Sequence, residues 1–322
     1  MTRVVLTRMV QTVLVILVMS FVIYALIGLM PGDPIDLMIT SNPHLTSADA
    51  ARLRALYGLD RPILERYLAW LAASLHGDLG FSRAFQRPVL EVLWPRLANT
   101  VLLMGSSFAL SVVVALPLGM WAALRPNSRL DQAINLLCFA GISVPVFWLA
   151  LVLIVVFSVT LGWLPAGGMG TLGTETLVDK ARYLALPLAT LTAATVGGFA
   201  RYMRASMIET LRQDFIRTAR AKGAGRARVV LRHALRNALI PVVTVVALSF
   251  GSLFSGALVT ETMFAYPGMG RLIYDSIMGN DFNVALVGLL FATLLTLLGN
   301  LAADLAYVWL DPRVSYAARR GQ

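Results

Sequence analysis

Charge, cysteine and histidine are all scarce in this chain of 322 residues. Only 14% of the residues are charged, whereas about a quarter are charged in a soluble globular domain. The single cysteine, Cys138, excludes an internal disulfide and is expected to be a small buried side chain. Cys138 and the three scattered histidines, His44, His76 and His233, are not expected to form a metal site.

The motifs of several enzyme classes are also missing. The chain has no G-x-x-x-x-G-K-[ST] loop to hold a nucleotide phosphate and no H-E-x-x-H helix to hold a catalytic zinc. Ser106, Ser107 and Ser143 lie in apolar runs, but no histidine falls at the same depth to activate them. We therefore expect no catalysis and no bound cofactor in this chain, and an intramembrane enzyme is disfavoured.

Long apolar runs are abundant instead. Hydrophobic residues make up 58% of the chain and the mean hydropathy is +0.74, so much apolar surface must face lipid. A helix needs about 20 apolar residues to cross the hydrocarbon core. The sequence predicts an all-α integral membrane protein, one transmembrane domain over residues 1–322, with about six transmembrane helices: Met9–Met30, Ala98–Leu124, Ile134–Leu161, Leu184–Tyr202, Leu239–Phe264 and Val284–Leu310.

The first apolar run is expected to be a retained helix rather than a removable signal. It is longer than the apolar core of a signal peptide and ends at Pro31–Pro34 instead of a cleavage site with small residues.

The basic residues fall between the apolar runs. The net charge is +10, but lysine supplies only two of the 27 basic residues, so topology explains the charge better than nucleic-acid binding. The stretch Arg201–Arg236 holds ten of them against two acids, and the positive-inside rule places it in the cytoplasm. Both termini are then cytoplasmic, in agreement with basic residues near both ends: Arg3, Arg8, Arg319 and Arg320.

Residues 31–97 form a long outer loop, which is predicted to be structured and periplasmic. Thr46 and Asp49 have the spacing of a capping box, and Gly58 is a helix stop. A second amphipathic stretch runs from Ile63 to Leu75. The loop is either a lid over the helix ends or a docking surface for an external partner.

The cytoplasmic loop contains a short amphipathic stretch between two breaks. Asp214 is predicted to be its N-cap and Gly223 its stop. Phe215, Ile216 and Ala219 are expected to share one face. A short amphipathic helix away from the membrane core is typical of a part that a partner grips.

A second helix is predicted to follow and to run through Pro241 into the fifth span. Arg228, Arg232 and Arg236 recur on it at four-residue spacing. Contact with anionic lipid headgroups, worth about 1 kcal/mol per charge, explains this stripe best.

The chain resembles the permeases of ABC importers, in the variant of the dipeptide, oligopeptide and nickel group. The cytoplasmic loop is similar to their "EAA" signature, although Thr218 stands where other importers carry glutamate. The other matches are to the first of that group's two paired permeases and cover nearly the whole chain. The motifs are Leu29–Pro34, Tyr57–Pro62, Gly77–Ser82, Ser143–Trp148, Thr218–Gly223, His233–Pro241, Glu261–Gly270 and Leu310–Arg313.

This resemblance implies a type I ABC importer permease fold in the bacterial inner membrane. The core permease region would be residues 98–310, with a coupling loop over 206–238. The implied partners are a second permease in a heterodimer, two cytoplasmic ATPase subunits that bind ATP and Mg, and an external solute-binding protein. The ATPase contacts implied are Asp214, Phe215, Ile216, Arg217, Thr218, Ala219, Arg220, Ala221, Lys222 and Gly223.

Three polar residues at predicted membrane depth are further candidates, because such groups usually face protein or water. Asn300 and Asp304 lie one turn apart in the last span, and Asp304 is expected to pair with Arg201 or Arg204 in preference to lining the pore. Glu261 is expected near the outer face.

The resemblance implies half of a translocation pore, with short peptides as the solute. Nickel chelates, glutathione and opines are alternative solutes of the same machinery. The alternative of another class is a self-sufficient secondary transporter. That class predicts charges or broken helices in several spans, whereas the distinctive features here lie outside the bilayer.

Overall fold

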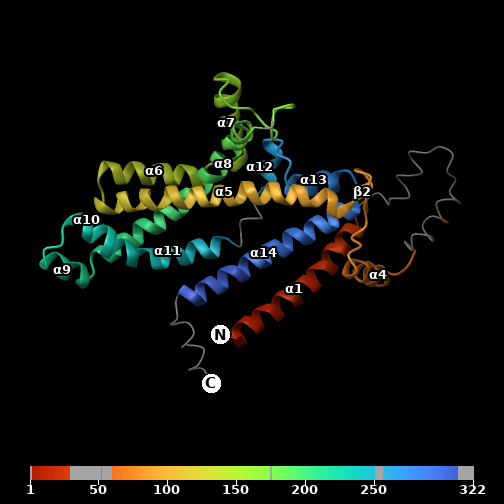
Figure 1. The fold of residues 1–322 in the computed structure, drawn as a ribbon, viewed down its shortest axis with the longest axis horizontal. Helices are drawn as coiled ribbons and strands as arrows, with labels where there is room; N and C mark the ends of the chain where they lie inside the picture. The colour runs from red at the N-terminus through yellow and green to blue at the C-terminus, as the bar shows by residue number, and fades with distance from the viewer. Residues whose placement is uncertain (1, 30–51, 53–59, 175, 251–256, 311–322) are drawn as a thin grey trace.

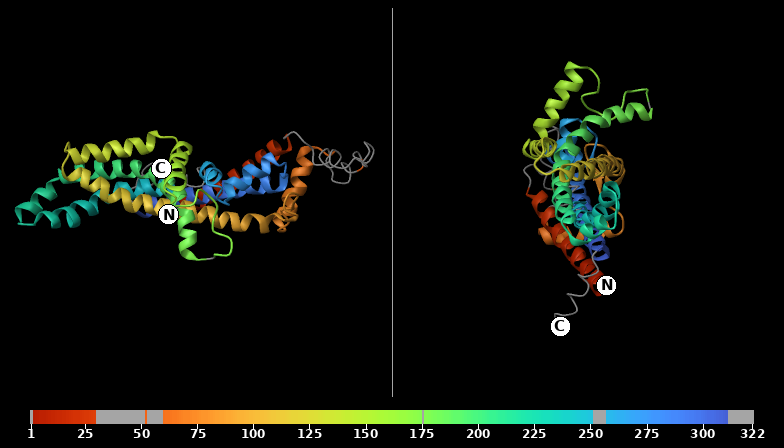
Figure 2. Two further views of the ribbon diagram at one scale, coloured as in Figure 1. Left: turned by 90° about the horizontal axis from the view of Figure 1, so that it is seen from above. Right: turned by 90° about the vertical axis from the view of Figure 1, so that its left-hand side faces the viewer.

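The computed structural model describes residues 2–29, 52, 60–174, 176–250 and 257–310, and of residues 2–6, 8, 250 and 304–310 the backbone only. Nearly every described element is helical, in an elongated molecule (Figures 1 and 2). The helices are α1 (Thr2–Gly28), α4 (Ile63–Leu75), α5 (Val89–Leu124), α6 (Arg129–Ser143), α7 (Val146–Leu153), η1 (Ile154–Thr160), α8 (Leu177–Leu211), α9 (Asp214–Ala221), α10 (Arg226–Arg228), η2 (Val229–Ala234), α11 (Leu235–Phe250), α12 (Ala257–Met263), α13 (Met269–Met278) and α14 (Phe282–Leu310).

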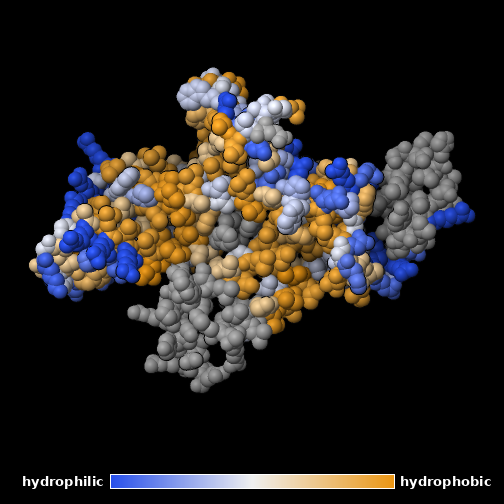
Figure 3. All heavy atoms as spheres, viewed as in Figure 1, coloured by the Kyte–Doolittle hydropathy of each residue, from blue (hydrophilic) through white to orange (hydrophobic). Residues whose placement is uncertain are grey.

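The helices confirm an all-α membrane protein. Hydrophilic residues gather at the end formed by α9 and α10 and at the opposite end around α4, with apolar residues between them (Figure 3). In the described chain five helices are long and apolar enough to cross a membrane, and a sixth span results if the bent pair of α6 with α7 and η1 is one span. The five are Met9–Gly28, Val89–Leu124, Leu177–Leu211, Arg226–Ser249 and Phe282–Ala303.

The predicted span Ile134–Leu161 is a bent pair of helices and not one continuous helix. The chain bends by 105° between α6 and α7. Pro145 precedes α7, and Val144 before it is extended, with φ −78° and ψ 126°. A residue before proline avoids the helical conformation, and proline has no N–H to continue the helix. The arm formed by α7 and η1 consequently projects to the side of the bundle (Figure 1).

The fifth predicted span, Leu239–Phe264, is described in part. The candidate span among the described residues is Arg226–Ser249, and α12 covers Ala257–Met263. Residues 251–256 lie outside the described part. The helix begins within the basic loop, so the end of that loop and the candidate span are one continuous rod.

The long helices α5 and α8 form the centre of the bundle, and α6 packs beside α8 (Figure 1). Small residues allow close approach: a Cβ on Gly141 of α6 would lie 2.5 Å from the carbonyl oxygen of Ala193 of α8. Gly119 of α5 likewise faces the backbone of Ala200. Since lipid offers no hydrophobic drive between helices, such close packing holds membrane helices together.

Two parts of the predicted outer loop lie among the described residues. The predicted amphipathic stretch Ile63–Leu75 is confirmed as α4, and the helix predicted around Thr46 lies outside the described residues. The Tyr67 hydroxyl of α4 lies 2.7 Å from Ser20 Oγ of α1. A hairpin of β1 (Phe81–Ser82) and β2 (Arg87–Pro88) follows.

Asp281 ties this hairpin to the turn between α13 and α14. It accepts hydrogen bonds from Ser82 Oγ (2.5 Å) and from the N–H of Ala84 (3.0 Å). Both Ser82 and Asp281 are buried. The end of the molecule opposite α9 therefore contains α4, the hairpin and α13, tied to the long helices by polar contacts.

Candidate coupling site

The predicted short helix exists as α9, with one correction at its start. Gln213 is the N-cap and provides no side-chain hydrogen bond, so the prediction of Asp214 as N-cap is wrong. Asp214 is the first helical residue, and its carboxylate pairs with Arg217 at 3.0 Å on the exposed surface. The helix ends as predicted: Gly223 has φ +77°, a conformation that side chains disfavour, and its N–H donates to Arg220 O at 3.0 Å.

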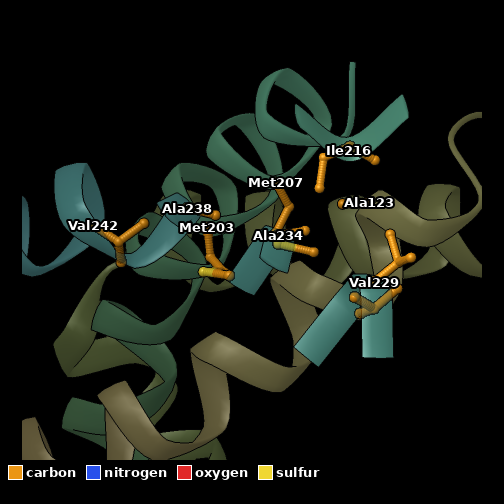
Figure 4. Close-up of a cluster of buried hydrophobic side chains, with 9 residues drawn as sticks. Ala123, Met203, Met207, Ile216, Val229, Ala234, Ala238 and Val242 are labelled. Carbon is orange, nitrogen blue, oxygen red and sulfur yellow. The ribbon is translucent and has the colours of Figure 1, made fainter. Parts of the chain in front are cut away.

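One side chain anchors α9 to the body of the protein. Ile216 is fully buried in a cluster with Ala123 of α5, Met207 of α8 and Val229 of η2. Figure 4 shows Ile216 directed towards Met207 and Ala123. The anchor therefore connects α9 with three neighbouring helices at once.

Phe215 does not share this face, contrary to the sequence-based expectation. It remains 42% exposed, while Ala219 packs partly against the cluster with Ile216. Consecutive residues are turned by about 100° on a helix, so neighbours 215 and 216 cannot face the same way. The chain thus leaves a large aromatic side chain on the outer face of α9.

A hollow of about 400 Å³ opens beside α9. Arg220 and Arg226 contribute its basic side chains, and the ends of α5 and α8 contribute apolar ones. Its lining residues are Leu124, Leu211, Arg220, Ala224, Arg226, Val229 and Val230. The surface around α9 therefore combines positive charge with apolar contact area.

The rod that follows α9 is held to α8. Ser206 Oγ donates to the carbonyl oxygen of Ala238 at 2.7 Å, next to buried contacts of Met203 with Ala238 and Val242. Arg228, Arg232 and Arg236 are all exposed on the rod. A displacement of α9 would thus reach both α8 and the fifth span.

The two arginines suggested as partners of Asp304 have other neighbours. Arg204 donates from Nε and Nη2 to the two carboxylate oxygens of Asp131, each at 2.6 Å, and Arg201 lies 4.5 Å above the Phe139 ring. The side chain of Asp304 lies outside the described atoms. Sequence reasoning missed Asp131, although its position three residues after Ser128 is capping-box spacing, and Ser128 Oγ accepts its N–H.

Asn300 lies on the surface of the described part of the chain. It is exposed and lines a hollow of about 410 Å³ between the antiparallel helices α1 and α14. Glu261, by contrast, is fully buried between α12 and α5, where it accepts a hydrogen bond from Thr100 Oγ1 at 2.5 Å. The structure therefore does not bring the three predicted polar candidates together.

The surroundings of Glu261 have a low polarity. Burial raises the pKa of the Glu261 carboxyl, although the hydrogen bond from Thr100 opposes the shift. Burial, with the nearby Glu261 charge, raises the pKa of Tyr266 to about 12. Neither side chain is exposed enough to meet a solute. Within the described residues, no group of three histidine, cysteine or acidic side chains could hold a metal ion.

The bundle of apolar spans with an amphipathic helix anchored at one end defines a class: a multi-pass membrane subunit whose distinctive surface lies outside the bilayer. Models of two family regions match the chain, "Binding-protein-dependent transport system inner membrane component" over residues 115–316 and its N-terminal region over residues 1–104. The chain belongs to this family of bacterial inner-membrane permeases, as its motifs predicted. It is accordingly a transport subunit.

Curated relatives match over almost the whole chain. The oligopeptide transport system permease protein AppB of Bacillus subtilis is 39% identical over 311 residues, covering 96% of this chain and 98% of the relative. The dipeptide transport system permease protein DppB of Alkalihalophilus pseudofirmus is 35% identical over 328 residues, covering 96% and 98%.

Two solved structures share the fold. The MetNI methionine ABC transporter in an inward-facing conformation matches with a TM-score of 0.52 and 19% identity, covering 69% of this chain and 97% of that one. An amino acid ABC transporter with histidines matches with a TM-score of 0.51 and 13% identity, covering 67% and 93%. The predicted ABC importer permease fold is thereby confirmed.

Proposed function

We propose that this chain forms one half of the translocation pore of an ATP-driven importer for short peptides. The names of the relatives in Bacillus subtilis and Alkalihalophilus pseudofirmus, oligopeptide and dipeptide permeases, support this solute class. A second permease supplies the other half, and an external binding protein delivers the peptide. Two ATPase subunits bind ATP and Mg on the cytoplasmic side, where both termini also lie. Nothing in the described residues favours nickel chelates, glutathione or opines.

The anchoring of α9 by Ile216 is the observation that carries this proposal. Ile216 is fully buried in the chain's own core, whereas Phe215 and the Asp214–Arg217 pair are exposed. A helix fastened along one side and exposed along the other suits a part that a partner grips. Closure of the ATPase subunits on ATP moves α9, and the Ile216 cluster passes that movement to α5, α8 and the fifth span.

A pull-down in mild detergent tests the assignment of α9. Tagged wild-type protein is expected to bring down ATPase subunits, and Phe215→Asp is expected to release them, because it places a charge on the gripped face without disturbing the core. Leu172→Asp is the matched control: Leu172 is fully exposed in the loop before α8, far from α9, and its replacement should leave co-purification unchanged.

The same preparation tests the transport class. The proposal predicts that the complex takes up a labelled dipeptide only with ATP and the binding protein. If the wild-type chain purifies alone and transports without ATP, a secondary transporter is the correct class and the proposal is wrong.

A further inference from the structure

Helix α13 begins without a capping side chain of its own. Its N-cap is Gly268, which has no side chain to accept the free N–H groups of the first turn. Those groups are satisfied from elsewhere: the N–H of Met269 donates to Thr100 Oγ1 at 2.7 Å, and the N–H of Arg271 donates to Glu261 Oε2 at 3.0 Å. Residues from α5 and α12 therefore cap α13 together.

The two capping side chains are also bonded to each other. Thr100 Oγ1 accepts from Met269 and donates its own proton to Glu261 Oε1 at 2.5 Å. Both side chains are buried, and within the described chain no basic group forms a salt bridge with Glu261. A buried carboxylate without a salt bridge needs donors on its oxygens, and the positive end of a helix dipole supplies them.

The backbone of the turn between α12 and α13 packs closely around the Thr100–Glu261 pair. A Cβ on Gly268 would overlap the Glu261 carboxyl group. Asn99 Nδ2 donates to Pro267 O at 2.8 Å, and the Tyr266 hydroxyl donates to Asn99 O at 3.2 Å. The turn between α12 and α13 is thus bonded to one turn of α5 by four separate contacts.

We propose that Thr100 and Glu261 form a shared cap that fixes α12 and α13 to α5, and that solute passage requires this cap. The cap lies on α5 at Thr100, away from α9, and α13 leads directly into the span of α14. Since α5 extends from this cap to the Ile216 cluster, the cap makes α12 and α13 follow the movement of α5. Thr100 and Glu261 are positioning residues that do not themselves contact the solute. The transport part of this inference rests on the proposed function.

Thiol labelling in the assembled complex tests the cap directly. Cys138 is the only cysteine of the chain, so Cys138→Ala gives a background for single reporters. Ser276→Cys places a reporter on the buried face of α13, and Ser111→Cys places a control in the middle of α5; both serines are buried. We expect Glu261→Ala and Thr100→Val to speed labelling of the Ser276→Cys reporter by N-ethylmaleimide about tenfold or more, the change that about 1.4 kcal/mol produces. Labelling of the control reporter should stay unchanged.

Uptake of a labelled dipeptide by the reconstituted complex tests the functional part. Glu261→Ala and Thr100→Val should each lower the maximal rate about tenfold or more, with the half-saturating concentration of the loaded binding protein unchanged. Thr100→Ser keeps the hydroxyl and should restore the rate. The control Thr262→Val should have no effect, because the exposed Thr262 hydroxyl bonds only its own helix at Leu258 O, 2.8 Å away.

The results separate the two proposals. Unchanged labelling of the Ser276→Cys reporter in both cap variants would overturn the cap, as would faster labelling combined with wild-type uptake. Equally fast labelling of both reporters would mean general unfolding and would also overturn it. Failure of wild-type protein to take up peptide would contradict the proposed function alone, because labelling still decides whether the cap holds α13.

Discussion

Two regions of α5, near Leu124 and near Asn99, hold their neighbours by different means. Near Leu124, the contact with α9 is apolar, through Ile216, Met207 and Val229. Near Asn99, hydrogen bonds to α12, α13 and the turn between them are added to apolar packing of α5 against both helices. One helix thus has a purely apolar contact near Leu124 and a contact that also includes hydrogen bonds near Asn99.

This difference bears on how movement passes through the molecule. Apolar packing is not directional, so the Ile216 cluster holds α9 by close packing of side chains alone. Hydrogen bonds weaken steeply when their angles change, so the shared cap also fixes the register of α13 on α5. Under the proposed function, we infer that a movement of α9 reaches α5 through the first contact and α13 through the second.

Ile216→Asp should produce the largest effect. It removes the apolar anchor and buries a carboxylate without a partner, at a combined cost of about 4 kcal/mol. An eight-residue helix held by one side chain cannot meet that cost, so α9 should leave the body of the protein. Limited trypsin digestion should then cleave at Arg217 and Arg220, with no change at Arg271 of α13.

Ile216→Val provides the control for that experiment. It keeps the apolar anchor and should cost about 1 kcal/mol, leaving the digestion pattern unchanged. If Ile216→Asp exposed Arg271 as readily as Arg217, the two ends would not be independent and the comparison between them would fail.

Asp131→Asn should have an intermediate effect. The substitution removes the charge that holds Arg204, whose side chain is 26% exposed, and should cost about 2 kcal/mol. Because this ion pair joins α6 to α8 and does not touch α9, the midpoint of thermal unfolding should fall without faster cleavage at Arg217. Faster cleavage there would show that a polar contact also supports the α9 joint.

Ser82→Ala should have the smallest effect. It removes one hydrogen bond to Asp281, which keeps the N–H of Ala84 as a donor, and should cost about 1 kcal/mol. The loss should appear as slightly faster labelling of a Ser276→Cys reporter in the Cys138→Ala background, well below that of Thr100→Val. An equal increase would mean that the hairpin, and not the shared cap, fixes α13.

Local signals made parts of this fold predictable from the sequence. The amphipathic stretch Ile63–Leu75 and the glycine stop at Gly223 depend on neighbouring residues alone, and both are confirmed. The break at Pro145 was equally local, but the apolar run around it concealed the conformational restriction that proline imposes.

Contacts between distant residues could not be predicted in this way. Thr100 and Glu261 are 161 positions apart, and Asp131 and Arg204 are 73 apart, so no periodicity or motif spacing links them. The sequence marked Glu261 only as a costly charge in an apolar region. The capping contacts of Glu261 depend on the fold, which places the start of α13 beside Thr100 and Glu261.

The difference between the buried side and the exposed side of α9 has an evolutionary consequence. Ile216 attaches the helix, and the residues on its other side are free of packing within the chain. Under the proposed function, substitutions at Phe215 or Arg217 would change which ATPase is recognised without repacking the interior. Duplicated importers in one cell would then diverge into separate, non-interfering systems by a few such surface changes.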